Sequence, residues 1–138
     1  MTEETSTSAI ILDMDGDDYS TEFSELMKSL NTDKFLVIQK RSTNTMTAYP
    51  VRDEDIYHLR LLVDVSKMDF KPGSTCMQMD RKIGPDDHIY RTMLEKIGND
   101  YYYECYFYGS EVHVPIDTLR DELLSVDGID DAIIERVR

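Results

Sequence analysis

Asp100-Tyr-Tyr-Tyr-Glu-Cys-Tyr-Phe-Tyr108 is the stretch that decides the fold. It is rich in aromatic residues and free of glycine and proline, which predicts a long β-strand. Gly109-Ser110 suits a tight hairpin turn, so residues 111–114 are expected to return antiparallel. Side chains alternate along a strand. One face is therefore expected to carry Tyr102, Glu104, Tyr106 and Tyr108.

Upstream of this strand, apolar and alternating segments predict four more strands. Their predicted ranges are 8–13, 35–38, 45–51 and 57–65. Ser42-Thr-Asn44 has the composition of a hairpin turn, and Pro50 marks the end or the edge of the strand that follows it.

Helical spacing of apolar residues predicts three helices. The first follows Asp18 and ends before Asn31, and the third runs from Asp117 to Leu124. The second is expected over residues 85–97, with Pro85 in its first turn and Gly98 as its stop. Residues 129–138 suit either a helix or a closing strand.

Together these segments predict a single α+β domain over residues 9–138, preceded by a disordered acidic tail, residues 1–8. The expected architecture is one mostly antiparallel or mixed sheet with about three helices on one face. The last β-α-β-like run resembles part of a ferredoxin-like sandwich. That resemblance carries no functional implication.

The net charge of −13 is unevenly distributed. Residues 1–25 carry eight acids and no Lys or Arg, residues 26–115 thirteen acids and twelve bases, and residues 116–138 seven acids and three bases. Such a field repels phosphate backbones and attracts basic protein surfaces, so direct nucleic-acid binding is not expected.

Targeting features and cysteine usage favour an intracellular, cytoplasmic location. No stretch is long and apolar enough to span a membrane, and residues 1–8 are acidic, unlike a signal peptide. Cys76 and Cys105 form no CxxC pair and no disulfide framework.

The segment Ala9-Ile-Ile-Leu-Asp13-Met-Asp15-Gly16-Asp17 delivers a DxDG motif at the end of a strand. It resembles the start of haloacid dehalogenase-type phosphatases. The resemblance implies that Asp13 is a nucleophile, that Asp15 is a general acid and that both help to hold Mg²⁺. It covers about ten residues, and this chain departs from the family pattern at Asp17.

Two other interpretations of the same residues stay open. Asp13, Asp15 and Asp17 are candidate ligands of Mg²⁺ or Ca²⁺ without catalysis, although Asp18 stands where an EF-hand loop needs glycine. The alternative is a strand-to-helix turn in which these aspartates cap the helix and no cofactor binds.

The sequence therefore favours a non-enzymatic regulatory or binding protein that contacts a basic protein surface. Tyr102, Glu104, Tyr106 and Tyr108 are the expected partner-binding residues, because tyrosine is enriched at interfaces. One version is an inhibitor that mimics a nucleic acid. The alternatives are a metal-dependent phosphate-handling enzyme centred on Asp13 and Asp15, and a structural subunit of a homo-oligomer.

Overall fold

The computed structural model describes residues 7–13, 34–67, 83 and 88–137. The backbone divides between Glu54 and Asp55 into two compact units, called here the first and the second unit. Each contains one antiparallel sheet. The expectation of a single domain over residues 9–138 stays a prediction.

The first unit contains a three-stranded sheet with β2 at its centre. Its strands are β1 (Thr7–Asp13), β2 (Lys34–Lys40) and β3 (Thr45–Pro50). The predicted turn between β2 and β3 is confirmed, and Asn44 takes a positive φ of 51° in it, which asparagine tolerates. β1 begins at Thr7, inside the range expected to be a tail.

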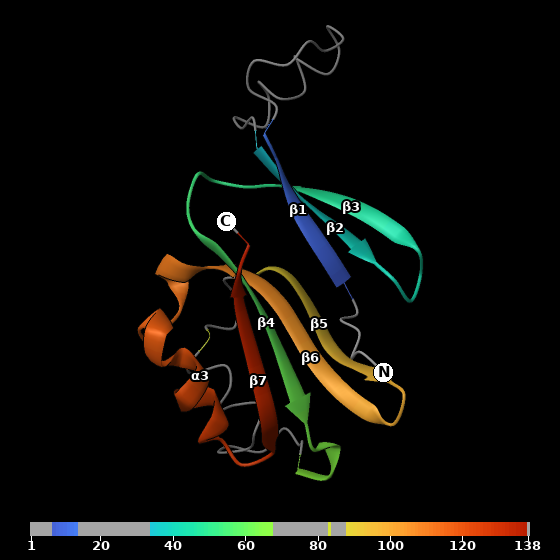
Figure 1. Cartoon of the computed structure of the whole chain (residues 1–138), viewed down its shortest axis with the longest axis vertical. Coiled ribbons are helices and arrows are strands. Elements are labelled where there is room, and N and C mark those ends of the chain that lie inside the picture. The colour runs from blue at the N-terminus through green and yellow to red at the C-terminus, as the bar shows by residue number, and fades with distance from the viewer. Residues whose placement is uncertain (1–6, 14–33, 68–82, 84–87, 138) are drawn as a thin grey trace, which may run out of the picture. The chain divides into compact units, whose positions relative to one another are not determined.

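The second unit contains a sheet with the strand order β5-β6-β4-β7 (Figure 1). Its strands are β4 (Ile56–Val63), β5 (His88–Ile97), β6 (Asp100–Tyr108) and β7 (Ile129–Arg136). β6 and β7 both pair antiparallel with β4, so they run parallel to each other on either side of it. Helix α3 (Ile116–Leu124) connects them, which makes a split β-α-β unit.

The hydrophobic core of the second unit lies between α3 and one face of this sheet. Leu119 and Leu123, one turn apart on α3, are fully buried. They belong to one cluster with buried side chains of β4, β6 and β7. These side chains include Leu59, Leu61, Tyr103, Cys105, Phe107 and Ala132. Burying a leucine side chain stabilises a fold by about 1.5–3 kcal/mol, so α3 is held chiefly by this face.

The expected fold class, α+β with one sheet, about three helices and a partly ferredoxin-like arrangement, is wrong for this chain. Strand accounts for 59% of the described residues, and these form two sheets. Among the described residues, α3 is the one α-helix with both ends defined. The prediction is wrong in its number of sheets, since two are present where one was expected, and in its number of helices, since about three were expected. The helix expected after Asp18 lies outside the described residues.

The clearest local error is the helix predicted over residues 85–97. Residues 88–97 form β5, which pairs with β6. The register shifts twice along this pair, between His88 and Tyr90 and between Thr92 and Glu95. Each irregularity changes which residues face the core, so the apolar residues lose their period of two and imitate helical spacing.

The predicted returning strand at residues 111–114 is also wrong. Gly109–Glu111 form a 3-10 helix, η2, and residues 112–114 are irregular. The reason is topological: both neighbours of β6 are already occupied, by β4 and β5. The Gly109 N–H instead donates to the Asp55 carbonyl at 3.1 Å, beside the start of β4.

The open assignment of residues 129–138 resolves as a strand, because β7 covers Ile129–Arg136. Beyond β4 the chain forms a short 3-10 helix, η1 (Val65–Lys67). No helix in the described ranges combines the length and apolarity that crossing a bilayer requires.

Candidate functional site

The four residues expected to bind a partner are buried in the structure. Tyr102, Glu104, Tyr106 and Tyr108 share one face of β6, as alternation predicted, but none is exposed. His58 and Arg60 of β4 are buried on the same face, opposite Tyr106 and Glu104 in the strand register. We call His58, Arg60, Tyr102, Glu104 and Tyr106 the polar layer.

Direct contacts hold the polar layer together. The His58 Nε2 and Glu104 Oε2 atoms lie 2.5 Å apart, and the His58 ring stacks on Tyr106 with centroids 4.5 Å apart. The Arg60 guanidinium carbon lies 4.5 Å from the centroid of the Tyr102 ring. Imidazole and carboxylate are groups used in acid–base catalysis. Because Glu104 is completely inaccessible to solvent, we assign the layer a structural role.

The opposite face of β6 carries a partly buried polar contact. The Tyr103 hydroxyl lies 3.2 Å from His88 Nε2, and burial raises the pKa of Tyr103 above its ordinary range. Burial likewise raises the pKa of the Cys105 thiol, which is fully buried. Cys105 belongs to the hydrophobic core of the second unit, and its thiol is the less reactive, protonated form.

The aspartates expected to hold a metal are described only in part. Asp13 ends β1 opposite Lys34, and its carboxylate lies 3.7 Å from the Lys34 ammonium. Asp15 and Asp17 lie outside the described residues. Within the described ranges, no group of three or more His, Cys, Asp or Glu side chains forms a metal site. The metal site and its phosphatase version stay predictions.

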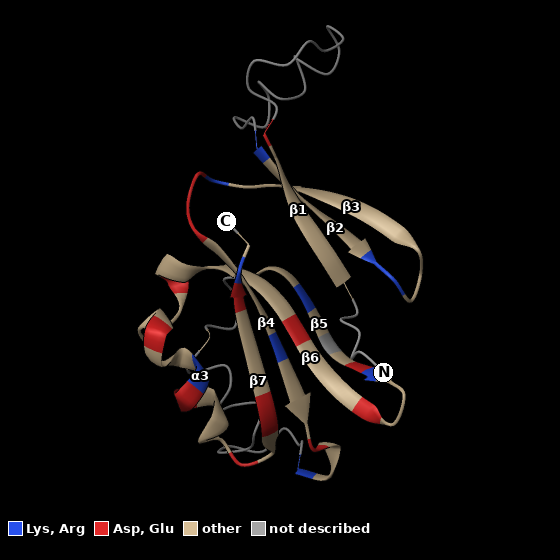
Figure 2. Ribbon diagram, in the orientation of Figure 1, with Lys and Arg blue, Asp and Glu red and all other residues tan. Residues whose placement is uncertain are grey.

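Acidic residues gather on α3, β7 and the connection between them, as the red segments of the ribbon in Figure 2 show. Segment 116–136 contains seven acidic and two basic residues. Six of the acids are exposed, and we call them the acidic surface: Asp117, Asp121, Asp127, Asp130, Asp131 and Glu135. Asp117 and Asp121 stand one turn apart on α3, where neighbouring carboxylates reinforce each other's field.

Both arginines of this segment are bonded within the chain. Arg120 Nε donates to the Ala132 carbonyl at 2.9 Å, and its Nη2 lies 3.5 Å from Asp131. Arg136 donates to Asp55 at 2.7 Å. Within the described part of the chain, by contrast, four members of the acidic surface make no side-chain hydrogen bond: Asp117, Asp121, Asp130 and Glu135. Asp130 contributes with Asp127 to the field at Lys67, and all four carboxylates are exposed to solvent.

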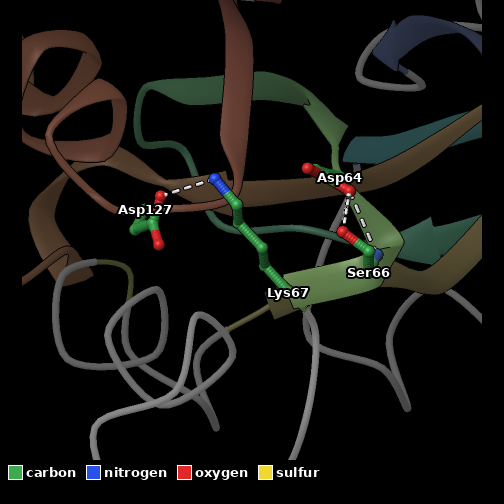
Figure 3. Close-up of polar contacts among 4 residues, drawn as sticks. All are labelled: Asp64, Ser66, Lys67 and Asp127. Carbon is green, nitrogen blue, oxygen red and sulfur yellow. Dashed lines mark hydrogen bonds and ion pairs between the residues drawn. The ribbon is translucent and has the colours of Figure 1, made fainter.

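An exposed polar cluster joins the end of β4 to the connection before β7 (Figure 3). The Asp64 carboxylate accepts from the Ser66 hydroxyl at 2.7 Å and from its N–H at 3.1 Å, and these bonds lower the pKa of Asp64. Lys67 donates to Asp127 at 2.9 Å, which raises the pKa of Lys67. Backbone bonding from Asp64 N–H to the Gly128 carbonyl, at 2.8 Å, ties the same two segments.

Comparison of the chain with protein-family models, with curated proteins and with solved structures finds no match.

Proposed function

We propose that this chain is a small, acidic, non-enzymatic binding protein that contacts a basic protein surface through the acidic surface of α3 and β7. The observation that carries the proposal is the imbalance described above. Six exposed acids stand on one helix, one strand and their connection, while both arginines of the segment are bonded within the chain.

Charge of one sign on neighbouring elements produces a directional field that accelerates encounter with an oppositely charged partner. α3 is anchored in the core through Leu119 and Leu123, so its outward carboxylates are held on a rigid element. A rigid array of carboxylates also suits the version in which the protein occupies a nucleic-acid-binding groove. Both versions predict binding that weakens as salt screens the charges.

A fluorescence anisotropy titration with a lysine-rich peptide tests this function. A matched peptide with glutamine in place of lysine serves as the neutral probe. We expect the lysine peptide alone to bind, and its affinity to fall as salt rises. Neutralising Asp117, Asp121, Asp130 and Glu135 to Asn or Gln is expected to weaken binding about tenfold, since exposed charge pairs contribute about 0.2–1 kcal/mol each.

The control neutralises four acids outside the acidic surface: Asp53, Glu54, Glu95 and Asp100. It changes net charge by the same amount but leaves α3 and β7 intact. Equal weakening in both quadruple variants would show that only net charge matters and would remove the assignment to this surface. Salt-independent binding would contradict charge-directed recognition altogether.

A further inference from the structure

The outer edge of β7 is capped by side chains. β7 is an end strand of its sheet (Figure 1), and among the described strands it pairs with β4 alone. At Ala132 both backbone groups have a side-chain partner: Arg120 Nε donates to the carbonyl at 2.9 Å, and the N–H donates to Asp131 Oδ1 at 2.9 Å. Because this N–H bonds outside the ladder with β4, Ala132 faces the outer edge, and Ile134, two residues further on, faces it too. An edge strand offers such groups to a further strand.

Arg120 makes the two contacts that a basic partner strand would make at this edge. Its Nε takes the place of a backbone donor to the Ala132 carbonyl, and its Nη2 lies 3.5 Å from the Asp131 carboxylate, where a partner's cation would pair. The side chains of Arg120 and Asp131 are 54% and 51% exposed, so a competing strand can reach them. Because an exposed ion pair contributes little to stability, the competitor can displace Arg120 at small cost.

One face of β7 carries an alternating row of an acid, an apolar residue and an acid. Asp131, Ile133 and Glu135 stand at every second position of the strand, so their side chains share a face. All three are exposed, Ile133 at 41%. Directly opposed side chains of neighbouring strands interact, so this row matches a strand that presents a cation, an apolar residue and a cation in the same alternation.

On the basis of the function proposed above, we propose that the basic partner adds an extended strand antiparallel to β7 and displaces Arg120 from this edge. The backbone of the added strand bonds to Ala132 and Ile134, and its alternate side chains meet the row of acids. Main-chain bonds supply affinity, whereas the row selects lysine and leucine at alternate positions. A second copy of β7 does not fit, since it would bring its own carboxylates to this row.

Fluorescence anisotropy on the full chain, with a labelled peptide that has Lys-Thr-Leu-Thr-Lys at its centre, tests the strand addition. In the bound peptide both threonine amides face β7, whereas the leucine amide and the amide of the second lysine face away. We expect N-methyl groups on the two threonine amides to weaken binding about tenfold, since two hydrogen bonds are lost. The same groups on the two amides that face away are the matched control and should change little. Binding of the unmodified peptide should also slow hydrogen exchange at the Ile134 amide, measured by NMR.

Arg120→Gln removes the side chain that the peptide has to displace. We expect it to tighten binding of the unmodified peptide about threefold or more, because an ion pair and a hydrogen bond no longer compete. Arg136→Gln is the matched control: it removes the same charge from the same segment, at a side chain that donates to Asp55, and should tighten binding less than about twofold. Far-UV circular dichroism checks that each variant folds, and Arg120→Lys, which keeps the charge, serves if Arg120→Gln does not.

Three results would contradict this mode of binding. Equal affinity of the two N-methylated peptides would show that charge alone holds the peptide, and it would leave the acidic surface as the binding site. Equal tightening by Arg120→Gln and Arg136→Gln would show that net charge acts without any displacement at the edge. Absence of binding by every lysine peptide at low salt would instead remove the function proposed above, and strand addition with it.

Discussion

Glu104 is fully buried, with its carboxylate 2.5 Å from the His58 imidazole. Removing one member of a buried hydrogen-bonded pair leaves the other without that partner, which costs about 1–3 kcal/mol. We therefore expect Glu104→Ala to lower the free energy of unfolding by about that amount, measured by urea denaturation.

An exposed ion pair supplies the control for this prediction. Asp55→Asn breaks the pair between Asp55 and Arg136, whose side chains are both more than half exposed, and should cost less than about 1 kcal/mol. A similarly small loss for Glu104→Ala would mean that the polar layer contributes little to stability. Replacing both partners, as in His58→Phe/Glu104→Leu, is expected to recover part of the loss, because the His58 imidazole is then no longer left without the carboxylate.

Asp13 offers a second test at the scale of single residues. Its carboxylate already faces the Lys34 ammonium at 3.7 Å, so we expect wild type and Asp13→Asn to melt alike with and without Mg²⁺. A metal site would instead stabilise wild type by about 2.7 kcal/mol at about a hundred times the dissociation constant. Thermal melts at matched ionic strength measure this, and a shift confined to wild type would establish the site.

The sequence could predict which side chains of β6 share a face, but it could not predict whether each face is buried or exposed. Alternation correctly placed Tyr102, Glu104 and Tyr106 together, since a strand fixes the direction of each side chain. Burial depends on what packs against the strand from distant parts of the chain. The pairing of Glu104 with His58 arises from the β4–β6 register, and no local signal in either segment encodes that register.

At the scale of elements, the β5–β6 hairpin turns at Gly98. Ile97 pairs with Asp100, and Gly98 takes a φ of +63° in the two-residue connection. A Cβ atom added there would meet nothing within 4 Å, so the cost of a side chain is backbone strain alone. We expect Gly98→Ala to destabilise the protein by about 1 kcal/mol, because a residue with a Cβ atom is strained at this positive φ.

Gly109 makes an informative comparison in the same thermal or urea denaturation series. A Cβ atom at Gly109 would lie 2.6 Å from Tyr57 Cε2, so Gly109→Ala strains packing and not the backbone. The two substitutions should therefore respond differently to Tyr57→Ala, which relieves only the crowding at Gly109. Relief of Gly98→Ala by the same change would contradict the assignment of its cost to φ.

The cluster of Asp64, Ser66 and Lys67 gives the end of β4 a dependence on pH. The Ser66 bonds lower the pKa of Asp64, so its contribution to stability is present above the unfolded pKa and is lost as pH falls through the folded one. Asp127 raises the pKa of Lys67, so the contribution of Lys67 to stability is lost only as pH rises through the pKa that Lys67 has in the folded protein. We expect an NMR titration to place the Asp64 midpoint below that of an ordinary aspartate, and Ser66→Ala to raise it.

Helices and strands were predicted correctly where the spacing of apolar residues followed a single regular period. Phe35–Ile38 and the alternation from Tyr57 identified β2 and β4, and Leu119, Leu123 and Leu124 identified α3. Prediction failed at β5, where two register shifts removed the strand period and Gly98 was interpreted as a helix stop. Gly98-Asn99 is a dipeptide typical of two-residue hairpin turns, and it was the local feature that indicated two strands, β5 and β6, at this point.

At the scale of the whole molecule, the net charge of −13 opposes folding through self-repulsion. We expect the melting temperature to rise by several degrees from about 0.01 M to about 0.15 M NaCl, as the screening length falls from about 30 Å to about 8 Å. Differential scanning calorimetry measures the shift. A melting temperature that falls with salt would show that ion pairs, such as Arg136 with Asp55, outweigh the repulsion.

The strand order of the second unit also has a consequence for synthesis on the ribosome. β4 needs β6 on one side and β7 on the other, and Tyr57 pairs with Arg136. A nascent chain that has released β4 therefore carries a strand with neither neighbour until much later residues emerge, and it must close long loops to acquire them. This sheet completes only after translation has passed β7, which makes β4 the segment that a chaperone would need to shield in the meantime.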